Sequence, residues 1–293
     1  MRMGVCMDGQ KLFGMFQRWF RIGQRNQRIL ILLMIIGVGM AGTVFSQGAA
    51  PTEDRVLLPS DGTLRRIHVP ILMYHYVSPL PPDADEIRID LTVPPDVFRQ
   101  HMQLLEQEGY KTISLNQLYD ALVTGTALPP KPIVLTFDDG YIDHYRFVFP
   151  ILQEFGFSGT FFIITETADF NTSGHLSWAQ ITEMANAGMR MESHTKTHLD
   201  LRNRDWDFLV HQVMGSFESL QAHTGQTPSV FCYPAGRYDE VTLETLAQLP
   251  VSIAVTTQYG AYHTTNDRLE VPRLRMSSNT TAANLANMLE GSR

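Results

Sequence analysis

Two adjacent carboxylates, Asp138 and Asp139, are the residues best suited to chemistry, and Gly140 follows them. The mostly apolar run 133–137 precedes them and is typical of a buried strand in a parallel sheet. Such a strand must stop where the acids begin, and glycine allows the backbone to turn there. Because α/β barrels keep their catalytic groups at the carboxyl ends of their strands, the pattern predicts two carboxylates in one site. An ordinary Asp-Asp-Gly turn between a strand and a helix is the alternative.

A pair of histidines, His194 and His198, is the second feature that could do chemistry. Imidazoles four residues apart can bind one metal ion, either from a helix or from a bend after a strand. Two surface histidines in a loop are the alternative. Together with a carboxylate from another strand end, the pair would supply two nitrogen ligands and one oxygen ligand and leave coordination positions open. That set suits a catalytic divalent metal, most of all Zn²⁺, with Co²⁺ or Ni²⁺ as alternatives.

The elements that position these residues alternate between strands and helices from residue 67 to the end of the chain. We expect strands at 71–74, 112–114, 133–137, 159–165, 190–193, 230–233, 251–256 and 274–276. We expect helices at 96–108, 115–123, 145–155, 178–187, 206–223, 240–249 and 282–290. This alternation predicts a parallel sheet, and with six or seven such units the sheet should close into a barrel.

Several polar residues fall where an expected strand ends. They are His75, Asp138, Asp139, His194 and the turn 233–236. In a parallel barrel the carboxyl ends of the strands meet on one face, so we expect these positions to lie close together.

The amino-terminal segment does not belong to this fold. Residues 1–28 carry six basic residues and one acidic residue, and the next 17 residues, 29–45, carry no charge. A membrane-spanning helix needs roughly 17–25 apolar residues. The charge asymmetry predicts a cytoplasmic leader at 1–28, a transmembrane signal anchor at 29–45 and an exported body at the cell membrane. A cleaved signal peptide, which would give a secreted protein, is the alternative. Residues 46–66 are expected to be a linker and 67–293 the catalytic domain.

Composition excludes some classes of protein. The chain has 293 residues, of which 44% are hydrophobic and 18% charged, as in a globular protein. Its two cysteines, Cys6 and Cys232, are too few for a disulfide framework or a cysteine metal site. Without the basic leader the body has 17 basic and 29 acidic residues, a net charge of −12. Such a body is a poor partner for nucleic acid, whose phosphates demand positive charge.

Three motifs together resemble those of the polysaccharide deacetylases, carbohydrate esterase family 4, also described as the NodB homology domain. The motifs lie at 136–140, 194–198 and 231–236, and the resemblance covers roughly residues 67–293. It implies an α/β fold, a distorted (β/α) barrel of about seven parallel strands. It also implies metal-dependent removal of acetyl groups from N-acetylglucosamine units of a polysaccharide. By the same resemblance Asp138 is the general base, and Asp139, His194 and His198 are the metal ligands.

The third motif departs from the family in two places. The family has an arginine, which orients the catalytic aspartate, where this chain has Cys232. We expect Arg273 to replace it, with Arg237 as the second candidate. The family has a tyrosine where this chain has Ala235. That tyrosine contributes largely a backbone N–H, which alanine retains, so Ala235 stays a candidate donor to the oxyanion.

The late histidine of the family is also missing, and the segment 71–77 offers a substitute. It is similar to the circularly permuted branch that includes the poly-N-acetylglucosamine deacetylases, in which this strand moves to the amino terminus. The resemblance makes His75 the general acid; a histidine hydrogen-bonded to backbone at the edge of the core is the alternative. His263 is a weaker candidate acid and is expected to be exposed. Tyr141, Tyr233 and Tyr238 are candidate surfaces on which a sugar ring could stack.

Two classes of function remain open at this point. The first is a hydrolase that removes acetyl groups from a cell-surface polysaccharide, either an exopolysaccharide or peptidoglycan. The second is a non-catalytic, metal-containing module that binds glycans, which the missing arginine motivates. Hydrolysis of a small non-sugar amide is a further alternative. Bound metal and released acetate distinguish the hydrolase from the binding module.

Overall fold

The computed structural model describes residues 59–292. The expected leader at 1–28, the expected membrane segment at 29–45 and most of the expected linker lie outside the described residues. In the described part of the chain, no helix combines the length and the apolar composition that crossing a membrane requires.

Seven parallel strands within residues 59–292 close into a barrel. Neighbouring strands pair in the order β2, β12, β10, β9, β8, β7 and β6, and β6 pairs again with β2. Their bounds are β2 (Ile71–Tyr74), β6 (Pro132–Phe137), β7 (Thr160–Ile163), β8 (Arg190–Ser193), β9 (Val230–Cys232), β10 (Ile253–Tyr259) and β12 (Val271–Arg275). The expected barrel of about seven parallel strands is confirmed. The earliest of these strands in the sequence, β2, lies between the last, β12, and β6, as the permuted order requires.

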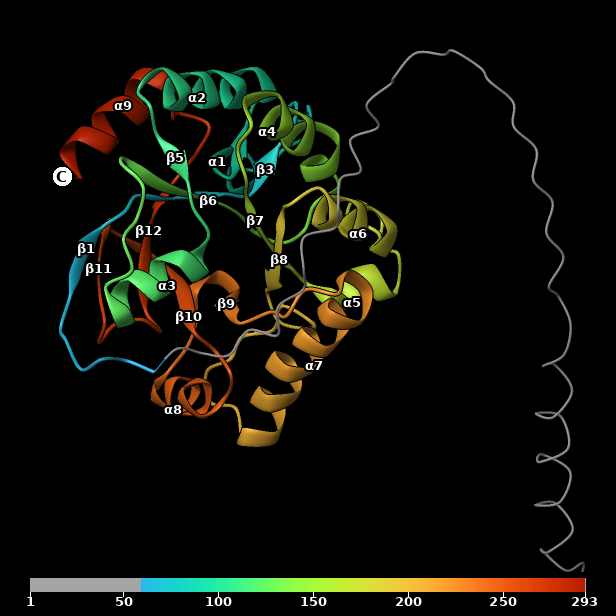
Figure 1. Ribbon diagram of the computed structural model, residues 1–293. Coiled ribbons are helices and arrows are strands. Elements are labelled where there is room, and N and C mark those ends of the chain that lie inside the picture. The colour runs from blue at the N-terminus through green and yellow to red at the C-terminus, as the bar shows by residue number, and fades with distance from the viewer. Residues whose placement is uncertain (1–58, 293) are drawn as a thin grey trace, which may run out of the picture. The chain divides into compact units, whose positions relative to one another are not determined.

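The longer helices surround this barrel (Figure 1). They are α2 (Pro95–Gln107), α3 (Leu115–Thr124), α4 (Phe149–Phe155), α6 (Trp178–Asn186), α7 (Trp206–Thr224), α8 (Glu240–Gln248) and α9 (Ala282–Gly291). Local sequence explains where several of them begin. Ser114, Ser177 and Asp239 each accept a hydrogen bond from the backbone N–H three residues later, which satisfies a donor of the first turn.

The remaining elements are short, and most were not expected from the sequence. Two antiparallel strands, β1 (Arg66–His68) and β11 (Tyr262–Thr264), pair beside the barrel, while β3 (Tyr76–Val77) pairs in parallel with β4 (Thr92–Val93). β5 (Lys111–Thr112) pairs with the start of β6. The short helical segments are α1 (Glu86–Asp90), the π-helix η1 (His144–Val148), α5 (Thr165–Asp169) and the 3₁₀ turn η2 (Pro234–Gly236).

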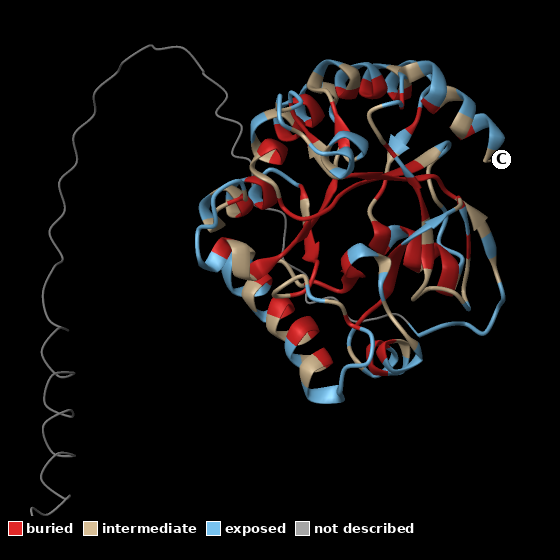
Figure 2. Ribbon diagram, turned by 180° about the vertical axis from the view of Figure 1, so that it is seen from behind, coloured by how far each residue is buried: buried red, intermediate tan, exposed pale blue. Residues whose placement is uncertain are grey.

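Side chains along each barrel strand alternate between two packing environments, because successive residues of a strand point to opposite faces. On β6, Leu135 and Phe137 pack with the core cluster that includes α2, α4 and α6. Val134 packs instead with apolar residues of other barrel strands and of α3. Thr136 and Asp138 continue the Val134 face and therefore point into the barrel. The strands form the most continuously buried part of the molecule (Figure 2).

The same alternation operates on β9. Cys232 belongs to the inner cluster with Val230, whereas Phe231 and Tyr233 pack outward against α7 and α8. The direction of each side chain near the carboxyl end of β9 is therefore set by its position in this two-residue period. This alternation decides which residues of the third motif can reach the site.

Candidate active site

The two carboxylates follow β6 directly, and both take part in the same polar cluster. The backbone of Asp139 is left-handed, with φ of 73°, a conformation that non-glycine residues seldom adopt. Thr195, His198 and Ala235 share this feature, with φ of 67°, 58° and 52°. Each such residue costs on the order of 1–3 kcal/mol, and residues of this kind cluster at active sites and ligand clamps. Four strained positions thus fall within the three motifs that the sequence singled out.

The expected metal ligands come together. The Nε2 atoms of His194 and His198 lie 3.2 Å and 3.3 Å from Oδ1 of Asp139. Ligand atoms of a tetrahedral zinc site with bonds of about 2.0–2.2 Å stand roughly 3.3–3.5 Å apart. The three residues form a cluster whose ligand atoms can hold one metal ion. Burial raises the pKa of Asp139, but hydrogen bonds from His194 and His198 outweigh it and hold that pKa well below its usual value.

Neighbouring groups orient both histidines. Nδ1 of His194 lies 2.8 Å from the carbonyl oxygen of Cys232, so a proton on Nδ1 would leave Nε2 free as a ligand. The backbone N–H of His198 donates to Oγ1 of Thr195 at 2.9 Å. Buried Gln212 of α7 accepts from two backbone N–H groups of the same loop, those of residues 196 and 197. The loop that carries the second histidine is therefore tied to a long helix.

Arg273 occupies the place that the sequence predicted for it. It is 1% exposed and donates from Nη1 and Nη2 to the two carboxylate oxygens of Asp138, at 2.8 Å and 2.7 Å. It also donates to Oγ1 of Thr136 and to the carbonyl oxygen of Thr256. Because β2 separates β12 from β6, the contact with Asp138 crosses the interior of the barrel. Burial raises the pKa of Asp138, but the guanidinium outweighs it and keeps the pKa below its usual value.

Cys232 lies beside this pair and could in principle be a metal ligand together with Asp138 and His194. Its Sγ atom is 3.6 Å from Oδ2 of Asp138 and 3.4 Å from Nη2 of Arg273. Burial and the Asp138 carboxylate raise the pKa of the thiol, and only a thiolate binds metal well. Asp138 already holds Arg273 with both oxygens. The set of Asp139, His194 and His198 is therefore the better metal site.

His75 follows β2 and faces the same carboxylate. Its Nε2 lies 3.8 Å from Oδ2 of Asp138, and its side chain is 14% exposed. Burial lowers the pKa of His75, and the Asp138 and Asp139 carboxylates act in the opposite direction without cancelling it. Two buried side chains that the sequence interpretation missed contact the backbone of residues 75–77. His144 contacts the His75 carbonyl oxygen through Nε2 at 2.6 Å, and Asp143 accepts from the Val77 N–H at 3.0 Å.

Asp143 and His144 stand at the start of η1, the π-helix that follows the first motif. Single-turn π-helices occur frequently at functional sites, and this one turns two polar side chains toward the strand that carries His75. Local sequence contains no signal for that arrangement, since it depends on the pairing of β2 with β6.

Ala235 presents a free backbone donor at the end of β9. Its N–H has no acceptor within the described part of the chain, and its left-handed conformation is continued by Gly236 with φ of 66°. A Cβ atom at residue 236 would stand 2.1 Å from Oγ1 of Thr257, so only glycine fits there. An unpaired N–H on a tightly constrained turn is suited to stabilise negative charge.

Two expectations from the sequence were wrong, those for Tyr233 and His263, and the second-ranked arginine candidate, Arg237, is excluded. Tyr233 is 1% exposed, packs outward in the core and donates its hydroxyl to the Leu269 carbonyl, so its ring cannot stack on a sugar. His263 is buried rather than exposed, and its Nε2 lies 2.7 Å from the Val69 carbonyl oxygen. Arg237 is exposed and pairs with Asp200, which leaves Arg273 as the arginine of the site.

Known proteins are similar to this chain in sequence and in fold. The profile of the family described as polysaccharide deacetylase matches residues 125–254. YxkH of Bacillus subtilis, a candidate polysaccharide deacetylase by name, is 31% identical over 209 residues, which cover 71% of this chain and 71% of YxkH. The poly-beta-1,6-N-acetyl-D-glucosamine N-deacetylase of Escherichia coli K12 is 23% identical over 88% of this chain, but the match spans only 44% of that protein.

Solved structures agree with the fold. The deacetylase PplD of Streptococcus pyogenes, solved in complex with acetate, has a TM-score of 0.71 and 31% identity, covering 77% of this chain and 99% of PplD. A polysaccharide deacetylase from Bacillus cereus has a TM-score of 0.66 and 27% identity, covering 76% of this chain and 69% of that one. The chain belongs to the polysaccharide deacetylase family, whose members are generally hydrolases.

Proposed function

We propose that this protein is a metal-dependent hydrolase that removes N-acetyl groups from N-acetylglucosamine units of a cell-surface polysaccharide. One observation carries the proposal. Asp138 is held by two hydrogen bonds from Arg273 and stands between the candidate metal ligands and His75. A base, an acid and a metal site are the three parts that hydrolysis of an unreactive amide requires.

The donor set fits zinc, with cobalt or nickel as alternatives. Asp139, His194 and His198 would hold the ion. When bound, such an ion supplies Lewis-acid chemistry, which lowers the pKa of water and stabilises negative charge on the acetyl oxygen.

The side chains of this chain supply the remaining steps. Asp138 accepts a proton from the water that attacks the acetyl carbonyl, which suits a carboxylate kept ionised by Arg273. The N–H of Ala235 donates a hydrogen bond to the oxyanion that forms. His75 donates a proton to the nitrogen as the C–N bond breaks, because the amine is a poor leaving group without it. The products are acetate and a glucosamine unit.

The alternative of a non-catalytic glycan-binding module rested on the missing arginine of the third motif. In this chain Arg273 makes the contact with Asp138 that such an arginine would make. This contact favours the hydrolase. Acetate in the solved structure of the relative PplD supports an acetyl group as the group removed, and the substrate in the name of the Escherichia coli relative favours a sugar over a small non-sugar amide.

The test is acetate release by the full-length protein after chelation and restoration of Zn²⁺, Co²⁺ or Ni²⁺. The substrates are β-1,6-linked N-acetylglucosamine oligomers, chitin oligomers and peptidoglycan. We expect acetate from at least one of them, loss of release on chelation and recovery with metal. A protein that binds the metal stoichiometrically but releases acetate from none of the three would be a binding module instead.

We also propose that the catalytic domain works outside the membrane, anchored through residues 29–45. The six basic residues before that uncharged segment support this orientation. Protease added to intact cells should remove the catalytic domain if the anchor is retained. Recovery of the domain from the medium, with a new amino terminus after residue 40, would favour the cleaved signal peptide.

A further inference from the structure

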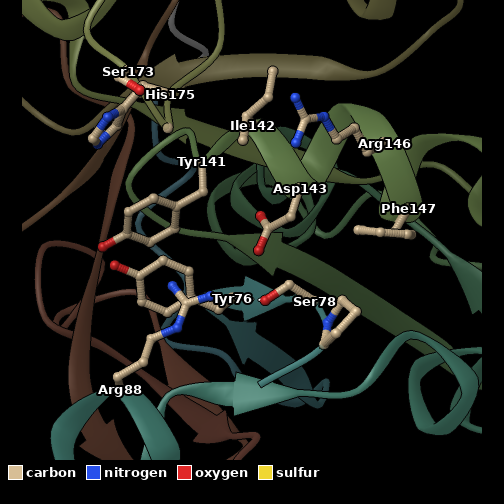
Figure 3. Close-up of a pocket in the computed structure, with 12 residues that line it drawn as sticks. Tyr76, Ser78, Arg88, Tyr141, Ile142, Asp143, Arg146, Phe147, Ser173 and His175 are labelled. Carbon is tan, nitrogen blue, oxygen red and sulfur yellow. Dashed lines mark hydrogen bonds between the residues drawn. The ribbon is translucent and has the colours of Figure 1, made fainter. Parts of the chain in front are cut away.

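A pocket of about 510 Å³ is lined by residues that follow the first motif and β2 (Figure 3). Tyr141, two residues after the metal ligand Asp139, forms part of its wall. The rest of the wall comes from the segment after β2, from α1, from η1 and from the loop before α6. A sugar adjoining the one that is deacetylated could therefore reach this pocket.

The charge in the pocket is positive, although the body of the protein is acidic. Arg88 of α1 and Arg146 of η1 line it together with one carboxylate, that of Asp143. Within residues 59–292 neither arginine forms an ion pair with a carboxylate, whereas most other arginines there do. Asp143 accepts a hydrogen bond from the Val77 backbone N–H, so one of its two carboxylate oxygens already has a partner within the fold.

Arg88 is held in place before any ligand binds. Its guanidinium carbon lies 3.2 Å from the centre of the Tyr76 ring, and Nη2 donates to Oγ of Ser78 at 2.8 Å. Its Nε is buried and has no acceptor, and the same is true of Nδ1 of His175 across the pocket. A guanidinium fixed in this way loses little conformational entropy when it binds a planar or tetrahedral anion.

The ring of Tyr76, which forms part of the pocket wall, is not available to stack on a sugar. The rings of Tyr76 and Tyr141 stack on each other with their centres 3.8 Å apart. The guanidinium carbon of Arg88 lies 3.2 Å from the centre of the Tyr76 ring, which leaves no room for Tyr141 on the same face, so Arg88 covers the opposite face. Tyr76 is thus enclosed on both faces, and the pocket offers N–H and O–H donors where a neutral sugar site would offer an open ring.

We propose that this pocket binds an anionic group, a carboxylate or a phosphate, carried by the sugar next to the N-acetylglucosamine that is deacetylated. Arg146, which is exposed at the rim, and the immobilised Arg88 are the specificity-determining residues. The inference rests on the proposed deacetylation and narrows its substrate to an acidic glycan. An uncharged N-acetylglucosamine polymer would offer neither arginine an anionic group to bind.

The experiment compares three oligomers of equal length with the full-length, zinc-restored protein. One is an uncharged N-acetylglucosamine tetramer, one alternates with N-acetylmuramic acid and so carries carboxylates, and one carries 6-phosphate groups. We expect kcat/KM for at least one acidic oligomer to exceed that for the neutral tetramer by about tenfold or more, as charge-assisted hydrogen bonds allow. The comparison between the two acidic oligomers shows whether the pocket prefers a carboxylate or a phosphate.

The variant Arg146→Gln should remove most of that preference by raising KM for the acidic oligomers. Arg66→Gln is the matched control, because Arg66 is also exposed, stacks on Tyr262 and lies in no ion pair within the described residues, but belongs to β1. It should keep the preference. Equal kcat/KM for all three oligomers, or a preference that survives in Arg146→Gln, would overturn the inference.

Failure of the proposed activity gives a different result. In that case no oligomer releases acetate, and binding decides the inference. Calorimetry with the same oligomers should still show tighter binding of an acidic one, weakened about tenfold in Arg146→Gln but not in Arg66→Gln. Equal binding of the neutral and acidic oligomers would reject the anionic subsite whatever the activity.

Discussion

The guanidinium of Arg273 donates two hydrogen bonds, of 2.8 Å and 2.7 Å, to the carboxylate of Asp138, although 135 positions separate the two residues in the sequence. The contact runs across the interior of the barrel from β12 to the end of β6. It places a permanent positive charge beside the candidate base. This charge comes from β12, whereas the third-motif arginine of the family would come from the strand equivalent to β9. The barrel therefore permits the same contact from more than one strand.

We predict that Arg273→Met lowers kcat by about 10²-fold or more, because Asp138 loses both its orientation and the charge that keeps it ionised. Cys232→Arg added to this variant should restore at least tenfold, since Sγ of Cys232 already lies 3.6 Å from Oδ2 of Asp138. Acetate release measures both effects. Circular dichroism must show a folded protein, because loss of one partner of a buried ion pair can cost about 3–5 kcal/mol. A folded Arg273→Met variant with normal kcat would refute the assigned role.

Substitutions of the two adjacent aspartates should have different effects on metal content and on kcat. Asp138→Asn should retain the metal and lose about 10²–10⁴ in kcat, because it removes the base. Asp139→Asn should lose the metal, since it replaces the charged carboxylate, whose Oδ1 lies 3.2 Å and 3.3 Å from the two histidine nitrogens, with a neutral amide. Metal content by mass spectrometry and acetate release, measured on the same samples, separate the two. Equal metal loss in both variants would contradict this division.

His75→Gln should lower kcat by about 10²–10⁴ with little change in KM, because the leaving amine then lacks a proton donor. His144→Phe should give a smaller loss of kcat, about tenfold, since the hydrogen bond of His144 is to the backbone carbonyl oxygen of His75 and not to its imidazole. His144→Gln, which keeps a donor at that position, should recover part of it. If His144→Phe and His144→Gln are equally impaired, His144 acts through packing alone.

Acid should destabilise the fold through two buried histidines that are not among the candidate metal ligands. Burial lowers the pKa of His101 and of His263 from 6.5 to about 4. The unfolded chain therefore binds more protons between pH 6.5 and about 4, and the free energy of unfolding falls as the pH falls through this window. The full effect is about 3 kcal/mol for each histidine.

Denaturant unfolding at pH 7, 5.5 and 4.5 measures this loss. His263→Gln should reduce its slope with pH, while His211→Gln, on the exposed part of α7, should leave the slope unchanged. A free energy of unfolding that does not change from pH 7 to pH 4.5 would contradict the prediction.

Much of this molecule follows from local sequence. The alternation of strands and helices, the ends of β2, β6 and β8, and the grouping of His75, Asp138 and His194 at those ends were all predictable. Each depends on short-range regularities, namely a run of apolar residues, a polar residue where that run stops and a glycine or a cap that ends the element. The choice of Arg273 over Arg237 also came from the sequence, but only as one of two candidates.

Only the tertiary structure decided which way individual side chains face. Tyr233 and Cys232 are neighbours in one motif, yet the two-residue period of β9 turns the cysteine inward and the tyrosine into the outer core. The closure of β2 against β6 and β12 brings Asp143 and His144 to the backbone of His75 and encloses Tyr76 between Tyr141 and Arg88. Such contacts join residues that are distant in the chain, so no local pattern records them, and they exist only once the barrel has closed.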